Sequence, residues 1–528
     1  MDDTKCAVEK AFQTTFKIIF GECNVTLDEL EDYLWRYLYP IKKRKSAFSE
    51  KDIFLCHHPY CEGAKMISQD EENMDINRKF EPLDINKIKD IDSIINEIKD
   101  RIYYAGNRRY GVCDFVEKSD AIVDSFYIYN SHFLNKTKYI GYSSCLRDGS
   151  EHAFGSALSL RIKYVIKTAM ADKITRSFET YLSTNSSDLF FCYDCRGSNH
   201  LMFSFNIRSK NYCIGNLELP KDKYMVIRKK LIDESREHIE KYKTFYSIFE
   251  SLPPIKVKPM ITVKDKPVPP RDFKPIEEAW KSTCRIVLGK DIGPLQKYER
   301  LLSERINPIK RFKTICGNET CSSDLMFYKY IPKERYASSE ESEEVAKQHI
   351  TFEDGEEISL KSIIEKISPI AFFKVEIHEG NTTNYVDTQN DYNAINTYKT
   401  CDGAFVKNIA YNSMVLNSEY IFGSYRISYS KFCIKSNGVN ISCCFDVASC
   451  INSSNLIYCY DVEGLDNCMF CFNTKAKRYA IGNVEIGKEN YMKIKKLVLD
   501  EITAKLEKDG TLPFDIFTIA CYNPNSVP

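Results

Sequence analysis

The chain has 528 residues, enough for about three or four average domains or two large ones. Apolar residues make up 43% of the sequence and charged residues 28%, a globular composition that argues against global disorder. Lysine plus arginine equals aspartate plus glutamate, at 74 each. This balance disfavours a protein built mainly to bind nucleic acid or an anionic membrane, although a local basic patch is compatible with it.

The first residues and the cysteine content set expectations about location. The start, MDDTKCAVEKAF, is acidic and lacks an apolar stretch, so we expect no secretory signal. No run of about 18 uncharged apolar residues occurs, so we expect no transmembrane helix. The 21 cysteines are then expected to stay reduced in the cytoplasm, or in a particle assembled there.

Residues 1–102 are predicted to be mainly helical. Apolar residues recur at helical spacing in three stripes. The stripes are Ala11, Phe12, Phe16, Ile19 and Phe20, then Leu27, Leu30, Tyr33, Leu34 and Leu38, then Ile91, Ile94, Ile95, Ile98 and Ile102. We interpret them as the core-facing sides of amphipathic helices.

Residues 103–219 are predicted to form β-rich repeats. Short apolar or aromatic pairs alternate there with Ser, Asn, Asp, Gly or Cys, as the corners and interior of stacked β-solenoid coils require. An antiparallel sandwich is the alternative. A charged helix over 220–250 is expected to cover the open end of the solenoid. Seven of the 18 prolines fall between Pro253 and Pro275, so residues 251–275 are predicted to be an extended linker.

The second half repeats the first. FCYDCRGSNHLMFSFNIRSKNYCIGNLELPKDKYM from Phe191 matches YCYDVEGLDNCMFCFNTKAKRYAIGNVEIGKENYM from Tyr458, at a constant offset of 267 residues. SEHAFGS from Ser150 matches SEYIFGS from Ser418, and VEKAFQTTFKIIFG from Val8 matches IEEAWKSTCRIVLG from Ile276. The fold class expected is therefore α+β: a tandem duplication of one module with a helical start, a Cys- and aromatic-rich solenoid-like middle and a capping helix.

The two modules are predicted to be residues 1–250 and 276–528. In the second, we expect a helical or mixed segment over 276–399, β-rich repeats over 400–486, a capping helix over 487–510 and a tail over 511–528. Inside the β-rich part, CFDVASCINSSNL from Cys444 is followed fifteen residues later by CYDVEGLDN from Cys459, and then by CFN from Cys471.

The duplicated string Y-C-Y-D-x-x-G…M-F-x-F-N-x-x-x-K-x-Y-x-I-x-N…Y resembles a Cys-rich repeat family found among predicted proteins of uncultivated, small-genome archaea and bacteria. The match is specific over about 191–225 and 458–492 and weaker upstream. The resemblance implies a repetitive β architecture, and it carries over no catalytic residue.

Zinc is the metal that the cysteines suggest. Cys56-x4-Cys61 and Cys316-x4-Cys321 occur in both halves, and His57 and His58 could complete the first site, but CGNETC has no histidine. A second set has Cys-x2-Cys spacing, at Cys192 and Cys195 and at Cys468 and Cys471. These pairs do not occupy equivalent positions in the two halves, so packing inside the solenoid is favoured for them. No cofactor is otherwise expected.

Enzymatic chemistry finds little support. None of the eight histidines recurs at an equivalent position, and no nucleophile, phosphate-loop or metalloprotease motif stands out. Asp194 and Asp461, and Glu218 and Glu485, recur as carboxylates that a groove enzyme on polysaccharide would need. An aspartate in this context more readily makes a corner bond, so no catalytic residue is assigned.

The function expected is a non-catalytic structural or protein-interaction component, part of a homo-oligomer or larger assembly such as a virion or other particle. Duplication of a module doubles a binding surface and suits a repeating assembly. The alternative is a metal-stabilised nucleic-acid-binding protein that uses two basic segments at matching places. Their basic residues are Lys42, Lys43, Arg44 and Lys45 in the first half, and Lys310, Arg311 and Lys313 in the second.

Overall fold

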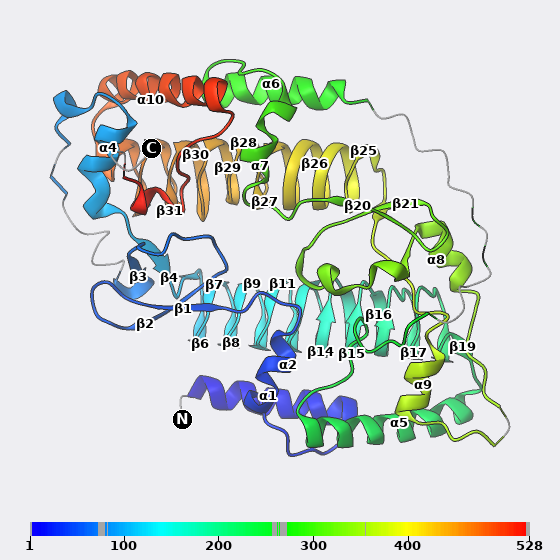
Figure 1. Ribbon diagram of the computed structural model, residues 1–528. Coiled ribbons are helices and arrows are strands. Elements are labelled where there is room, and N and C mark those ends of the chain that lie inside the picture. Colours follow the sequence, from blue (N-terminus) through cyan, green and yellow to red (C-terminus); the bar gives the residue numbers. More distant parts are fainter. Residues whose placement is uncertain are drawn as a thin grey trace.

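The computed structural model describes residues 3–71, 80–81, 83–255, 261, 263, 272–353 and 355–523. The fold contains both helices and strands, as the expected α+β class requires. Two stacks of short strands lie side by side, and helices cover the outer side of each stack (Figure 1). Most of the predicted linker lies outside the described residues, as does the end of the predicted tail after residue 523.

The first hundred residues are less helical than predicted. The elements are α1 (Asp3–Phe20), α2 (Glu31–Trp35), β1 (Lys42–Lys45), β2 (Asp52–Leu55), β3 (Met66–Ser68), α4 (Ile91–Ile98) and β4 (Tyr104–Gly106). The three apolar stripes lie in α1, around α2 and in α4, and their buried residues face the core. The segment between α2 and α4 instead contains a β1–β2 hairpin, because its short alternating runs suit strands rather than helices.

The first stack covers residues 104–218. Its strands after β4 are β5 (Arg109–Tyr110), β6 (Asp114–Glu117), β7 (Asp120–Val123), β8 (Phe126–Tyr129), β9 (His132–Asn135), β10 (Lys138–Gly141), β11 (Ser144–Arg147), β12 (Glu151–Phe154), β13 (Ala157–Leu160), β14 (Lys163–Ala169), β15 (Asp172–Tyr181), β16 (Thr184–Tyr193), β17 (Asn199–Met202), β18 (Asn211–Ile214) and β19 (Leu217–Glu218). These bounds agree with the β-rich repeats predicted for 103–219.

Neighbouring strands of this stack pair in parallel with a register of twelve residues. Phe126 pairs with Lys138, and Asn199 pairs with Asn211. The backbone enters the left-handed region at every third residue, as at Tyr127 and Asn130. Each twelve-residue turn therefore has four corners. The pairing differs from that of the antiparallel sandwich considered as the alternative; the β18–β19 end is antiparallel.

Interior positions also recur every third residue, and they alternate between apolar side chains and Ser, Thr or Cys. Ser143 is fully buried, and its hydroxyl donates to the Gly141 carbonyl (2.9 Å) and accepts from the Ser156 backbone N–H (3.0 Å). The same pair of bonds recurs one turn earlier at Ser131. These hydroxyls satisfy backbone groups that would otherwise be unpaired inside the stack.

Replacing an interior hydroxyl should cost more than its size suggests. Ser143→Ala removes the acceptor of the Ser156 N–H, and we expect the free energy of unfolding to fall by about 1–3 kcal/mol. Urea titration followed by circular dichroism measures the loss. The control is Ser209→Ala at an exposed corner. Equal changes in the two variants would contradict the role assigned to the interior hydroxyls.

The second half has the same order of elements. Before its stack come α6 (Lys274–Leu288), α7 (Glu299–Ser303), β20 (Lys310–Lys313), β21 (Glu319–Ser322), the short helix η5 (Met326–Tyr330), β22 (Tyr336–Ala337), α8 (Ser339–Val345), α9 (Leu360–Lys366) and β23 (Phe373–Lys374). The stack comprises β24 (Ile377–Glu379), β25 (Thr383–Val386), β26 (Asn390–Phe422), β27 (Tyr425–Ser428), β28 (Lys431–Ile434), β29 (Gly438–Phe445), β30 (Cys450–Ile457), β31 (Tyr460–Glu463), β32 (Asp466–Met469), β33 (Phe472–Lys475), β34 (Arg478–Ile481) and β35 (Val484–Glu485).

The second stack begins at Ile377, earlier than the predicted start at residue 400. Its first turns are held partly by an asparagine ladder on one corner, where Asn384 donates to Asn396 (2.7 Å) and Asn396 donates to Asn408 (2.7 Å). Polar ladders of this kind leave no apolar periodicity. The prediction of a helical or mixed segment to residue 399 was therefore wrong over its last part.

Helix α5 (Lys221–Tyr242) and helix α10 (Lys488–Asp509) occupy the predicted capping segments. Each starts at the end of its stack and runs along the outer side, beside α1 and α6 respectively (Figure 1). The end of the first stack is covered by the other half, where the Ile350 N–H donates to the Gly215 carbonyl (3.0 Å). The helices are thus lateral covers more than end caps. None of the described helices is both long and apolar enough to cross a bilayer.

The two halves exchange segments. The core of the first stack includes residues 325–377 of the second half, and the core of the second stack includes residues 53–104 of the first half. The exchange is reciprocal: the Asn206 amide donates to the Phe372 carbonyl (2.8 Å), and the Asn473 amide donates to the Tyr103 carbonyl (2.9 Å). The packed cores therefore do not follow the sequence boundaries at 250 and 276.

The duplicated aromatic motif lies at this exchange. Phe203, Phe205, Ile214, Phe470, Phe472 and Ile481 are buried, whereas Tyr212 and Tyr479 are half-buried. Asn206 and Asn473 occupy left-handed corners, as expected for turn residues. Their amides bond across to the other half instead of closing a local turn.

Candidate functional site

The four cysteines considered as zinc ligands are not gathered in one site. Cys56 is fully buried after β2, its N–H donates to Asp120 (2.8 Å), and burial raises the pKa of its thiol well above the ordinary value. Cys61 is bonded to Cys521. Cys316 lies against the Ile261 carbonyl (3.8 Å), and the Cys321 N–H donates to Glu376 (2.7 Å). Across the described ranges, no three His, Cys, Asp or Glu side chains are placed to hold a metal ion.

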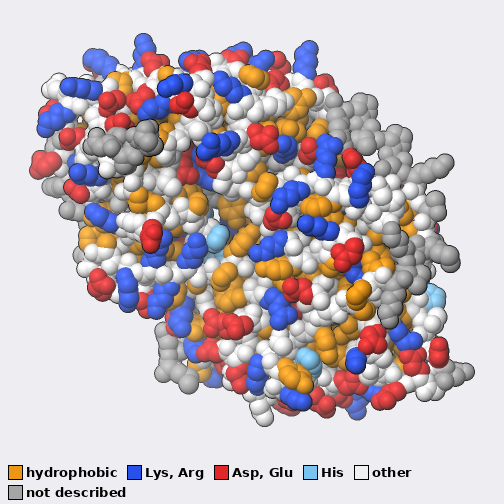
Figure 2. Space-filling model, viewed as in Figure 1, with side chains coloured by type: hydrophobic (Ala, Val, Ile, Leu, Met, Phe, Trp, Pro, Cys, Tyr) orange, Lys and Arg blue, Asp and Glu red, His pale blue; other side chains and the backbone are white. Residues whose placement is uncertain are grey.

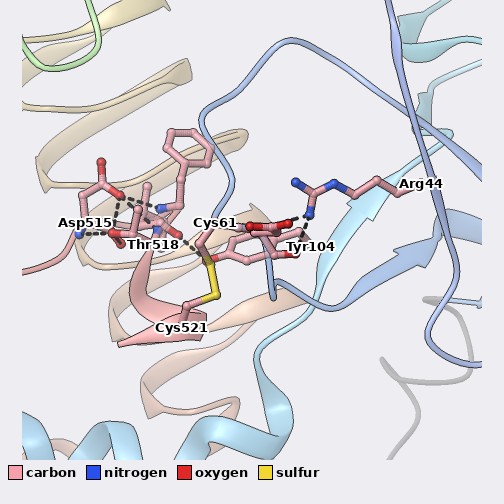
Figure 3. The surroundings of a disulfide bond; sticks show 9 residues. Arg44, Cys61, Tyr104, Asp515, Thr518 and Cys521 are labelled. Atoms are coloured by element: carbon pink, nitrogen blue, oxygen red, sulfur yellow. Dashed lines mark hydrogen bonds between the residues drawn. A yellow bond between two sulfur atoms is a disulfide. The ribbon is translucent and has the colours of Figure 1, made fainter. Parts of the chain in front are cut away.

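The Cys61–Cys521 disulfide joins the first half to the C-terminal segment, 460 residues away (Figure 3). The Cys61 N–H donates to the Phe517 carbonyl (3.2 Å), and the Tyr104 hydroxyl donates to the Ile516 carbonyl (2.7 Å). This pair differs from the expectation that all thiols stay reduced. The segment predicted as a tail is also packed, since Phe514, Ile516, Phe517 and Ile519 are buried.

Loss of this disulfide should weaken the joint between the halves. We expect Cys521→Ser to lower the free energy of unfolding by about 2–4 kcal/mol, because the cross-link restricts the unfolded chain. Urea titration measures the loss, and dithiothreitol should produce the same loss in the unmodified protein. Cys6→Ser, which removes a half-buried free thiol in α1, is the control. A Cys521→Ser variant as stable as the Cys6→Ser variant would contradict the prediction.

The Cys-x2-Cys pairs lie inside the stacks. The Cys192 Sγ donates to the Phe190 carbonyl (3.4 Å), and the Cys459 Sγ donates to the Ile457 carbonyl (3.5 Å), as interior serines do. Cys195, Cys468 and Cys471 make the same contact two residues back. These thiols pack the interior, and Cys192 and Cys459 share one kind of environment.

The basic segments form the first strands of two hairpins. Lys43 and Lys45 both pair with Asp52 (2.7 and 2.8 Å), and Arg44 donates to the Cys61 carbonyl (3.2 Å) (Figure 3). In β20, Lys310 pairs with Asp324 (2.7 Å), Arg311 with Asp387 (2.6 Å), and Lys313 with Glu319 (3.5 Å). Acidic neighbours thus compensate most of this charge, and only Lys42 lines a cavity.

The recurring carboxylates are engaged in bonds. Asp194 is fully buried and pairs with Arg196 (2.9 Å), Arg208 (2.7 Å) and Lys374 (3.0 Å), the last from the other half. Asp461 accepts from the Tyr110 hydroxyl (2.6 Å). Both aspartates sit at left-handed corners. Their bonds are those of structural groups at the joint between the halves.

A cavity of about 380 Å³ lies between the halves. Its walls come from both, with Tyr39 and residues 57–59 on one side, and residues 304–308, 435–437 and Phe517 on the other. A hollow with a histidine at its edge is visible near the middle of the face in Figure 2. The bond from Cys61 to Phe517 fixes two of these walls to each other.

Charges on the second-half wall of the cavity are compensated. The Arg305 guanidinium pairs with Asp446 and with Asp515 (3.0 Å), and it donates to the Lys435 carbonyl (2.8 Å). Lys435 is buried and pairs with Glu304. The network holds the wall rigid and nearly neutral.

Two histidines form the opposite wall. His57 is exposed and stacks on Tyr39 (5.0 Å between ring centres), and His58 is buried and stacks on Phe517 (4.8 Å). Burial lowers the pKa of His57, and Lys42 lowers it further. Burial, with Arg108 nearby, lowers the pKa of His58 well below its ordinary value. Both imidazoles are therefore neutral near pH 7.

Equivalent apolar residues are exposed on the outer helices of both halves. Ile18 and Met225 lie on α1 and α5, and Ile286 and Met492 lie on α6 and α10, at offsets of 268 and 267 residues. These four side chains are between 39% and 48% exposed. In the first half they border a shallow groove of about 500 Å³ that Val226 also lines. We call the two sets the α1/α5 patch and the α6/α10 patch.

Sequence reasoning missed both the cavity and the disulfide. The cavity walls come from segments between Tyr39 and Phe517 that no local pattern connects, and the adjacent histidines were the one visible signal. They were interpreted as additional zinc ligands. Comparison of the chain with protein-family models, curated proteins and solved structures finds no match.

Proposed function

We propose that the protein is a non-catalytic assembly component, made of two copies of a duplicated β-solenoid module, which associates with further copies of the same chain. The observation that carries the proposal is the recurrence of the exposed Ile and Met at matching positions on both outer sides. A large side chain that is exposed in one helix needs no explanation, but the same pair in both halves indicates a shared use.

The repeated element order supports the duplication. Helix, hairpin, parallel stack and lateral helix follow one another twice, at the offset seen in the sequence. The twelve-residue parallel register and the interior Ser and Cys columns support the solenoid. These features leave each half with one outer side covered by two helices, so the patches lie on opposite sides of the molecule (Figure 1).

The charge pattern along the lateral helices supports a second copy as the occupant. Helix α5 carries basic residues in its first half, including Arg228 and Lys229, and acidic residues in its second half, including Asp233 and Glu237. Helix α10 has the same polarity, with Lys495 and Lys496 before Asp500 and Glu501. An antiparallel contact between lateral helices of two molecules would therefore bring opposite charges together around an apolar centre.

Contacts at both patches would link copies into an open chain. Because the patches are on opposite sides, each molecule has two contacts and the assembly does not end at a dimer. Nucleic-acid binding, the alternative, is less well supported, because the basic strands β1 and β20 are paired with acidic side chains.

Sedimentation velocity over a concentration series tests the proposal. The unmodified protein should form oligomers that persist at moderate salt, Met225→Glu or Met492→Glu should stop growth at dimers, and the double variant should be monomeric. Val112→Glu, at an exposed valine on the edge of the first stack, is the control and should assemble normally. A protein that stays monomeric at 100 µM, a concentration we choose as about the upper range for weak assembly, would overturn the proposal. Salt-sensitive binding to single-stranded DNA would favour the alternative.

A further inference from the structure

The cavity between the halves exists in one half of the pseudo-symmetric molecule. Arg305, Lys435 and Phe517 line it or its wall, and the residues 268 positions earlier are Tyr37, Lys167 and Phe249. At that equivalent place, the Tyr37 ring packs against Phe249 (5.5 Å) and Tyr330 (4.6 Å). Aromatic rings thus fill the counterpart of the cavity, while the cavity stays open.

A buried polar atom in the wall of the cavity lacks a partner. His58 is 4% exposed, and within the described part of the chain no group bonds to its Nε2. Buried nitrogen atoms are normally paired, because leaving one unpaired costs the hydration it has lost. The ring is held in place by stacking on Phe517 and by edge contacts with Tyr60 (5.8 Å) and Phe133 (5.9 Å). A bound molecule would supply the missing bond.

The remaining walls indicate the class of molecule. Tyr39, Tyr425 and Phe517 offer ring surfaces, and Pro59 and Pro308 offer flat apolar ones. The charges of Arg305 and Lys435 are taken by Asp446, Asp515 and Glu304, which leaves Lys42 as the wall cation outside that network. A volume of about 380 Å³ is at the lower end of sites for small organic ligands.

We propose that the cavity is a binding site for a small aromatic carboxylate, whose ring lies among Tyr39, Tyr425 and Phe517, with its polar substituents toward His58 and Lys42. The neutral state of the two imidazoles suits this arrangement, since His58 can then hydrogen-bond a hydroxyl or ring N–H of the ligand. The carboxylate is drawn to Lys42 at the wall. This site is separate from the two outer patches and does not depend on the assembly.

Saturation-transfer NMR on the full chain with 4-hydroxybenzoate, and with its neutral counterpart 4-hydroxybenzamide, tests the proposal. The acid should bind, and the amide should bind about two- to fivefold more weakly, as expected for the loss of one exposed ion pair. Lys42→Gln should weaken the acid to the level of the amide. His58→Phe keeps the stacked ring, removes the nitrogen and should weaken both compounds about tenfold.

Matched controls come from the equivalent positions of the other half. Pro308→Trp should block the cavity and abolish binding, whereas Pro40→Trp, 268 residues earlier, should not. Lys310→Gln is the control for Lys42→Gln, and circular dichroism verifies that each variant is folded. Absence of saturation transfer at millimolar acid, or binding that survives Pro308→Trp in a folded variant, would overturn the proposal.

Discussion

Residues 1–250 and 276–528, produced separately, are expected to remain unfolded, and produced together they are expected to form a folded pair. Each core lacks an essential part when its half is alone: the first stack loses residues 325–377, and the second loses residues 53–104. The missing parts include fully buried side chains such as Phe327 and Phe373 in one core, and Ile94 and Tyr104 in the other. Exposing such faces removes the main driving force for folding.

The measurement is cooperative unfolding by circular dichroism, combined with size-exclusion chromatography of the single and co-expressed halves. The control is the full chain with a protease site inserted in the linker between residues 263 and 272. After cleavage, the two fragments should elute together and unfold cooperatively, even when dithiothreitol has broken the Cys61–Cys521 bond. A cooperative transition in either half alone would show that the exchanged segments are dispensable.

The exchange itself could not be predicted from the sequence. Asn206 bonds to the Phe372 carbonyl, and Asn473 bonds to the Tyr103 carbonyl, so the two contacts are chemically alike. A duplicated sequence indicates that a segment packs on a stack, but it gives the same local energy for either stack. The choice depends on the reach of the connecting chain, which no residue pattern records.

The turn length was also hidden, for a geometric reason. The sequence showed a spacing of fifteen residues between Cys444 and Cys459, whereas the strands pair at twelve. Interior positions recur at every third residue, so any multiple of three brings like residues into line. The stack could therefore be predicted from its Ser, Cys and aromatic columns, while its register could not.

The candidate sites fared unevenly for the same kind of reason. The recurrence of Ile18 and Met225 as Ile286 and Met492 is visible in the printed sequence, but their exposure depends on how the lateral helices are turned. The cavity requires His58 and Phe517 to meet across 459 residues, and no spacing rule connects them. Zinc was suggested by cysteines whose actual use is interior packing.

Truncation of an interior corner phenylalanine should be the most damaging single substitution considered. Phe470 is fully buried at a left-handed corner of the second stack, and its ring stacks on Tyr458 (5.3 Å between ring centres). We expect Phe470→Ala to lower the free energy of unfolding by about 3–5 kcal/mol, because the packed surroundings cannot collapse into the space left by the ring.

Phe405 provides a matched control for this substitution. It is also a phenylalanine at a left-handed corner of the second stack, with nearly the same φ (54° against 53°), but its side chain is 51% exposed. Replacement by alanine has the same backbone consequences at both positions, so the difference between the two variants isolates the buried ring. Phe405→Ala should change stability by less than about 1 kcal/mol. If urea titration gives similar losses for the two variants, the loss comes from corner strain, and the aromatic columns do not hold the stack together.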